Sequence, residues 1–282
     1  MQLRCGRSTA SRAIDRAARR LRLQSCLAAG ALMVLCALSG SVLAQQAEDK
    51  CAADDLKIVA RDLKLPELSP RADEGNVIAA ACRTWPYRSN LLLAALAYDE
   101  GVEYEKKLIV AVIDEKTRRV VSSLRSTIGE DAVTEVGEYS LRLDTARYQL
   151  ADGVRAFGVR FNSSARGASC GEAYWGDELT LYVPEGSNLR PVVTMNLSQQ
   201  HWLKGCPAAT SSALWEDAAL AVGMARASTN GFHDLEVTAK ISVSVEGDAA
   251  AGELKDRIER HTLHYDGKTY QKGKAVPWWL AI

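Results

Sequence analysis

The strictest pattern in the chain is an alternation of apolar and polar side chains over residues 234–245, DLEVTAKISVSV. Successive side chains of a β-strand point to opposite faces, so a period of two places every second residue on one face. The apolar residues that share this face are Leu235, Val237, Ala239, Ile241, Val243 and Val245. A helix would scatter them around its surface. The segment is therefore predicted to be a strand with one buried face.

Other strand-like runs follow one another along most of the chain. They cover residues 77–85, 91–98, 106–113, 119–126, 139–146, 154–161, 177–183 and 189–196. The turn-like stretches PYRSN, DEKTR, STNG and the pair Asp266-Gly267 separate neighbouring runs and indicate hairpins. Short strands joined by tight turns predict an all-β fold of antiparallel meanders. Both a sandwich and a small propeller-like assembly fit this pattern.

Three segments do not read plainly as strands. Residues 54–65 predict a short helix that ends before Pro66, with one apolar face made of Leu56, Val59, Ala60 and Leu63. Residues 211–226 fit a helix or a strand, and a strand from about Ala218 is favoured because STNG then forms a hairpin. Residues 249–261 fit a helix or a solvated insertion between two strands.

The N-terminal segment has the organisation of a secretory signal peptide. Seven arginines and one acid lie within residues 4–22, and residues 26–44 carry no charge. The apolar run ends on Val42, Leu43 and Ala44, a small-x-Ala exit that suits a signal peptidase. The sequence thus predicts a signal peptide at 1–44 and a single exported β-rich domain at 45–282. An uncleaved membrane anchor and a lipoprotein attached at Cys36 are the alternatives.

Removal of the leader changes the charge of the protein. The remaining 282 − 44 = 238 residues carry 35 − 7 = 28 basic and 35 − 1 = 34 acidic side chains, a formal charge of about −6. A chain of this charge has no general attraction to phosphate backbones or anionic lipids. Nucleic acid is therefore excluded as a partner, and membrane contact is expected only through an uncleaved leader.

Four cysteines remain after the leader: Cys51, Cys82, Cys170 and Cys206. An even number in an exported chain predicts two disulfides, for which three pairings exist. The pairs Cys51–Cys82 and Cys170–Cys206 are favoured because each joins neighbours in sequence. A zinc site is the competing interpretation, but its ligands usually come in close pairs and the chain has no Cys-x-x-Cys.

The sharpest catalytic motif is GASCG, residues 167–171, which matches the G-x-S-x-G pattern of a nucleophile elbow around Ser169. Such an elbow needs a helix after the serine, whereas the residues that follow read as loop and strand. Asp217, His233 and His261 come later in the order that hydrolases of this type use, an order that arises easily by chance. Ser169 is therefore not expected to be a nucleophile, and the motif is interpreted as a glycine-rich loop held through Cys170.

Other catalytic or metal-binding patterns are weak. Adjacent carboxylates, the starting point for a glycosidase, occur at Asp99-Glu100, Glu130-Asp131 and Asp177-Glu178. The spacing of His261 and His264 places them on opposite faces of a strand, where they cannot share a metal. No calcium loop of the D-x-D-x-D-G type occurs. The sequence thus predicts no metal, no cofactor and no catalytic residue.

Aromatic residues are the better indication of a binding role. Tyr174 and Trp175 are predicted to lie in a loop beside Cys170, where a tryptophan is suited to stack on a sugar or to anchor a protein. The more conservative interpretation is that Trp caps the edge of the core. The apolar C-terminus AVPWWLAI predicts a final edge strand docked in the core, with a tail read by a partner as the alternative.

These features favour a secreted or periplasmic protein with no enzymatic activity. The predicted function is a binding or envelope-support module whose partner is an envelope protein or a glycan. The alternative is an exported hydrolase that uses Ser169 or a carboxylate pair.

Overall fold

The computed structural model describes residues 50–70, 75–166, 173–206 and 210–281. The leader at 1–44 lies outside these ranges. The first part of the described chain contains α2 (Ala53–Leu63), β1 (Val77–Thr84), β2 (Leu91–Tyr98), β3 (Glu105–Asp114), β4 (Arg119–Gly129), β5 (Leu141–Asp144), β6 (Gln149–Ala151), β7 (Val154–Arg155) and β8 (Phe157–Phe161). The second part contains β9 (Ala173–Glu185), β10 (Asn188–Lys204), β11 (Ala213–Thr229), β12 (Phe232–Glu246), β13 (Arg257–Tyr265), β14 (Tyr270–Gln271) and the 3-10 helix η2 (Trp278–Leu280).

The predicted all-β fold is confirmed, and the strands pair mostly as antiparallel meanders. The long sheet follows the order β1-β2-β3-β4-β10-β11-β12-β13-β14, with β8 and β5 attached through β9 on the other side of β10. The meander β1–β4 joins the rest where Ser123 pairs in parallel with Asn188. This order contains no series of repeated blades among the described strands, so it is consistent with a sandwich-like arrangement and does not show a propeller.

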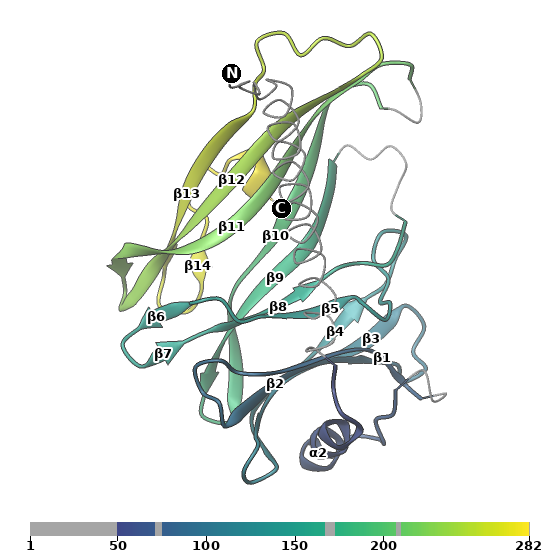
Figure 1. The fold of residues 1–282 in the computed structure, drawn as a ribbon, viewed down its shortest axis with the longest axis vertical. Coiled ribbons are helices and arrows are strands. Elements are labelled where there is room, and N and C mark those ends of the chain that lie inside the picture. The colour runs from purple at the N-terminus through teal and green to yellow at the C-terminus, as the bar shows by residue number, and fades with distance from the viewer. Residues whose placement is uncertain (1–49, 71–74, 167–172, 207–209, 282) are drawn as a thin grey trace, which may run out of the picture. The chain divides into compact units, whose positions relative to one another are not determined.

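The meander β1–β4 is covered on both faces (Figure 1). On one face Leu56 and Val59 of α2 pack against β2 and β3, including Leu96 and Ile109. On the other face the meander packs against β5 and β8, where Phe157 is fully buried. A strand buried on both faces has no polar face, which explains the continuous apolar runs 91–98 and 108–113.

The strands β9–β13 form the second core with one face of their sheet. Alternate residues of β12 enter that core as predicted, and Leu235, Val237, Ala239 and Ile241 are all buried. The same face leaves the core towards the end of β12, where Val245 is 43% exposed. The alternation therefore located the strand and its buried face, and only its far end extends beyond the core.

Two of the predicted hairpins show why their sequences favour turns. Asn230 and Gly231 join β11 to β12 with φ values of 50° and 89°, as a two-residue turn of the I′ type requires. Asp266 follows β13 and accepts hydrogen bonds from the backbone N–H groups of Lys268 and Thr269 at 2.7 and 2.8 Å. The Asn230-Gly231 turn closes a long hairpin. Residues 213–229 therefore form a strand that starts earlier than the predicted Ala218.

The segment 249–261 contains no helix. Residues 249–256 have no regular structure, and β13 begins at Arg257. The favourable helix composition of this segment is overridden because residues 257–263 pair with β12.

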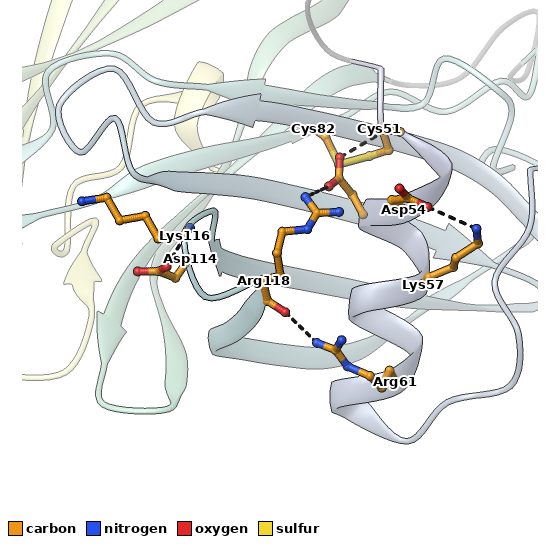
Figure 2. A network of polar contacts seen from close by, with 10 residues as sticks. Cys51, Asp54, Lys57, Arg61, Cys82, Asp114, Lys116 and Arg118 are labelled. Carbon is orange, nitrogen blue, oxygen red and sulfur yellow. Dashed lines mark hydrogen bonds and ion pairs between the residues drawn. A yellow bond between two sulfur atoms is a disulfide. The ribbon is translucent and has the colours of Figure 1, made fainter.

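Helix α2 is fastened to the meander by a disulfide and by polar contacts (Figure 2). The predicted Cys51–Cys82 bond joins the residues before the helix to β1. Arg118, from the β3–β4 turn, donates to Asp55 at 3.3 Å, and Arg61 Nη2 donates to the carbonyl oxygen of Arg118 at 2.6 Å. The helix therefore has anchors at both of its ends.

Asp62 provides a further anchor between α2 and β4. Its carboxylate accepts hydrogen bonds from Arg61 Nε at 2.7 Å and from the backbone N–H of Val120 at 2.8 Å, and it pairs with Arg119 at 3.1 Å. The hydrogen bond from Arg61, followed by that from Val120 and the charge of Arg119, lowers the pKa of Asp62 against the opposing effect of burial. The carboxylate therefore stabilises the fold in its ionised form.

We expect the Asp62→Asn variant to lose about 0.5–1 kcal/mol of unfolding free energy at neutral pH, since it keeps the Val120 bond and loses the charge. A lowered folded-state pKa contributes stability above the ordinary value near pH 4, and that contribution disappears as pH falls through the folded value. Urea unfolding at several pH values should therefore show the two proteins converging in acid. Lys57→Gln, which removes an exposed pair with Asp54, is the matched control. A difference that persists in acid would contradict the assignment.

The C-terminal segment docks in the core, although not as the predicted edge strand. Residues 278–280 form η2, and Trp279 and Leu280 are fully buried. Pro277 precedes them with φ −68°, an extended residue from which a tight helical turn starts. No helix in the described part of the chain combines the length and apolar character needed to cross a membrane.

Candidate binding surface

The predicted binding residues Tyr174 and Trp175 lie in strand β9 and not in a loop. In register, Trp175 is opposite Gln199 and Tyr174 is opposite Gln200. Their side chains lie outside the described part of the structure. The prediction of a loop was wrong because β10 is 17 residues long and therefore offers pairing partners to residues before Asp177. The backbone of Tyr174 and Trp175 thus lies at the end of the sheet where β9 begins and β10 ends.

The same end of the sheet carries a tryptophan pair that the sequence analysis did not identify. Trp202 of β10 and Trp215 of β11 are direct cross-strand partners. Their ring centroids are 4.9 Å apart with an interplanar angle of 53°. Both residues are only partly buried. A pair of this kind combines a large apolar surface with access from solvent.

Asp217 fixes the orientation of this pair. Its carboxylate accepts hydrogen bonds from Trp215 Nε1 at 2.9 Å, from Gln200 Nε2 at 2.8 Å and from Ser244 Oγ at 3.2 Å. These donors come from three neighbouring strands. With its oxygens engaged in this way, Asp217 acts as a support for the Trp215 indole.

The surface around the pair is polar. We call it the Trp202 face; it is the face of β10–β12 formed by Ser198, Gln200, Trp202, Trp215, Asp217, Ser242 and Ser244. These side chains share one face because each is in direct register with a neighbour or lies two residues along the same strand. Except for Trp202 and Trp215, they all carry hydroxyl, amide or carboxylate groups. The face is therefore suited to a ligand that has both apolar surface and many hydrogen-bonding groups.

The opposite face of the same strands holds a charged network beneath η2. Arg257 pairs with the buried Glu216, and its Nε donates to Glu259 at 2.6 Å. Trp279 Nε1 donates to Glu259 at 2.7 Å, and this bond, followed by that from Arg257, lowers the pKa of Glu259. The network satisfies the buried carboxylate of Glu216 and ties the C-terminus to β13. Its role is structural.

Beside this network, three side-chain nitrogens are buried without a hydrogen-bond partner in the described part of the chain: Gln199 Nε2, His201 Nδ1 and Trp278 Nε1. Gln199 is the backbone partner of Trp175, and the rings of His201 and Trp278 are 5.3 Å apart. These three nitrogens lie on the face opposite the tryptophan pair, and Gln199 belongs to the backbone pair with Trp175.

The residues of the serine-hydrolase alternative are not assembled by the described structure. Ser169 and Cys170 lie outside the described residues, and so does the predicted Cys170–Cys206 bond, although Cys206 is itself disulfide-bonded. Asp217 supports Trp215, His233 Nδ1 contacts Ser228 Oγ at 3.0 Å, and His261 Nε2 contacts the carbonyl oxygen of Lys272 at 2.7 Å. These three residues therefore make separate local contacts.

Two of the three adjacent carboxylate pairs are held by local contacts. Asp99 pairs with Lys106 at 3.0 Å, and Glu100 accepts from Tyr98 Oη at 3.0 Å. Lys106 also pairs with Glu130 at 3.4 Å. Asp131 accepts from the backbone N–H groups of Val133 and Thr134, and these bonds lower its pKa.

In the third pair, Asp177 forms ion pairs with Arg142 and Arg160. Asp177 also has φ 56°, which marks an irregularity in β9. Five of the six acids in these pairs thus have structural partners, and burial raises the pKa of the sixth, Glu178. Within the described residues, these contacts do not arrange a pair across a cleft.

The two histidines that are close in sequence, His261 and His264, do not share a face of their strand. His261 and His264 are both in β13, where a separation of three residues places them on opposite faces, and His264 pairs with Asp234 at 3.0 Å. Within the described ranges, no group of three or more His, Cys, Asp or Glu side chains is placed to hold a metal ion.

Comparison with protein-family models, with curated proteins and with solved structures found no match, so functional inference rests on the residues of this chain.

Proposed function

We propose that this protein is an exported, non-enzymatic module that binds a glycan on the Trp202 face. The export part rests on the predicted leader and on the Cys51–Cys82 disulfide, because disulfides persist mainly in oxidising compartments. The binding part rests on the tryptophan pair at the end of the β9–β12 sheet.

The observation that carries the proposal is the support of Trp215 by Asp217. An exposed indole normally samples several rotamers, and a ligand that binds it must fix one of them. Here the 2.9 Å bond from Trp215 Nε1 to Asp217 fixes the ring before any ligand arrives. The contact with Trp202, 4.9 Å away between centroids, adds a second apolar surface. Pre-orientation of this kind favours stacking.

The polar surroundings favour a sugar over a protein as the stacked partner. The core of a protein interface is depleted of charged groups, with polar groups at the rim. The Trp202 face instead places Gln200, Ser242 and Ser244 immediately beside the indoles. A sugar ring offers apolar C–H groups to the indole and hydroxyl groups to these neighbours. An envelope glycan therefore fits the surface better than an apolar protein patch.

We expect Trp202→Ala to weaken glycan binding by about 30-fold, which corresponds to about 2 kcal/mol for the loss of a central aromatic contact. Cosedimentation with purified cell-wall glycan, followed by titration with its soluble oligosaccharides, measures the effect. Tyr139→Ala is the matched control, since Tyr139 is 73% exposed and lies before β5, outside the Trp202 face. Equal binding by Trp202→Ala and the wild type, or equal loss in both variants, would contradict the proposal.

A further inference from the structure

The described arginines divide into those with a carboxylate partner and those without. The arginines with an ion pair are Arg61, Arg118, Arg119, Arg142, Arg160, Arg190, Arg257 and Arg260. Arg88, Arg147 and Arg155 have no ion pair within the described residues, yet they come from neighbouring parts of the fold. These three arginines are not the only ones without an ion pair among the described residues, but each of them contacts an aromatic side chain.

These three arginines gather around two aromatic side chains in the loop between β1 and β2. Arg147 Nε donates to Tyr87 Oη at 3.2 Å. The guanidinium carbon of Arg155 lies 3.2 Å from the centroid of the Tyr87 ring. Arg88 lies over Trp85, with 5.6 Å between its guanidinium carbon and the ring centroid. Arg155 belongs to β7 of the small β6–β7 hairpin (Figure 1), so this hairpin brings its charge to the loop.

Two of the side-chain nitrogens of Arg155 are buried, which raises the energetic cost of leaving them without an acceptor. Its Nε and Nη2 atoms are buried and have no hydrogen-bond partner in the described structure. Trp85, which is 1% exposed, also has a buried Nε1 without a partner. Buried donors normally have acceptors, and a buried guanidinium normally has an anion. Stacking on Tyr87 supplies a cation–π contact but no acceptor for these N–H groups.

The nearest acids in sequence do not neutralise the cluster. Asp144 is occupied by the N–H of Ala146 at 3.0 Å and the hydroxyl of Tyr148 at 3.1 Å. Asp152, in the turn between β6 and β7, is exposed and forms no ion pair in the described part of the chain. The positive charge also acts on the phenol: the hydrogen bond from Arg147, the charges of Arg147 and Arg155 and a weaker hydrogen bond from Arg155 lower the pKa of Tyr87 against the effect of burial.

We propose that Arg147, Arg155 and Tyr87 form a binding site for an oxyanion, a phosphate or carboxylate group carried by a small ligand. The exposed guanidinium of Arg147 presents a planar set of N–H donors that matches such groups in a bidentate manner, and Arg155 adds its positive charge. The phenol hydroxyl adds a further donor at the same point. This site is separate from the Trp202 face in sequence and does not depend on glycan binding there.

Isothermal titration calorimetry with inorganic phosphate, acetate and glycerol phosphate, at an ionic strength held constant with chloride, tests this site. We expect at least one of the oxyanions to bind and Arg147→Gln and Arg155→Gln each to weaken it about tenfold, as the loss of a charge-assisted bond implies. Binding of glycerol phosphate as well as inorganic phosphate would assign a phosphate group on a larger ligand, whereas binding of acetate alone would assign a carboxylate.

Arg226→Gln is the matched control because Arg226 is an exposed arginine of β11 that forms no ion pair among the described residues. It removes the same charge without touching the cluster. A second readout is the tyrosinate absorbance of Tyr87, isolated by subtraction of the Tyr87→Phe spectrum. A bound oxyanion should move the pKa of Tyr87 back towards its ordinary value. Absence of binding by all three oxyanions, or an equal loss in Arg226→Gln, would overturn the proposal.

Discussion

The Trp279→Ala variant is expected to lose about 4 kcal/mol of unfolding free energy, as the removal of a fully buried indole does in other cores. Trp279 has no exposed surface and packs in the core formed by β9–β13. Its Nε1 also donates to Glu259 at 2.7 Å, so its removal takes away one partner of the charged network under η2. Urea unfolding followed by circular dichroism measures the loss.

Two variants separate the contributions of Trp279. Trp279→Phe retains most of the apolar volume and removes the N–H donor, so it should lose about 1–2 kcal/mol. Trp278→Ala, at the adjacent and only partly buried position, should lose less than Trp279→Ala. Wild-type stability in Trp279→Ala would show that the docked C-terminus contributes nothing to the fold. A larger loss in Trp278→Ala would show that Trp278, and not Trp279, anchors the C-terminal segment.

The parts of the fold that could be predicted are those in which a local pattern and the tertiary environment agree. Strand β12 pairs with one strand on each side and covers one core. The period of two in its sequence is therefore also the period of its burial. The Asn230-Gly231 turn was identifiable because positive φ at both positions restricts the choice of residue. The apolar face of α2 was recognisable, although Ile58 is buried in addition to the predicted Leu56 and Val59.

The parts that could not be predicted depend on partners distant in sequence. Residues 173–176 become a strand because β10 extends far enough to pair with them, and nothing local to Tyr174 shows that length. The C-terminal segment has strand-like composition, yet it ends as η2 because Trp279 binds Glu259, which is 20 residues away. Composition indicated burial of this segment correctly but not its conformation.

The candidate sites illustrate the same limit. Trp202 and Trp215 were visible as aromatic residues, but their pairing follows from the register of β10 and β11. Arg147 and Arg155 reach Tyr87 across 60 residues or more, so their unpaired charge is a property of the fold. A pattern within one helix or strand predicts which of its faces is buried. A site made from several elements can be recognised only when the register between those elements is known.

The second large effect concerns Cys51–Cys82, and its physical basis lies in the unfolded chain. The bond closes a loop with a sequence separation of 31 residues, which in the chain-entropy model stabilises the fold by about 3.5 kcal/mol. We expect the Cys51→Ala/Cys82→Ala double variant to lose about this amount in urea unfolding. Substitution is used in place of a reductant, because a reductant would also act on Cys206, which is disulfide-bonded as well.

The loss should be concentrated in α2, because the bond ties the residue before the helix to β1. Without it, the helix keeps the contacts of Arg118 and Asp62 and the packing of Leu56 and Val59. Amide hydrogen exchange of residues 53–63 should therefore accelerate more than that of β12, which lies in the separate β9–β13 core. Cys82→Ala alone should match the double variant, since either change opens the loop. Equal acceleration in α2 and β12 would instead show that the disulfide acts on the whole domain as one cooperative unit.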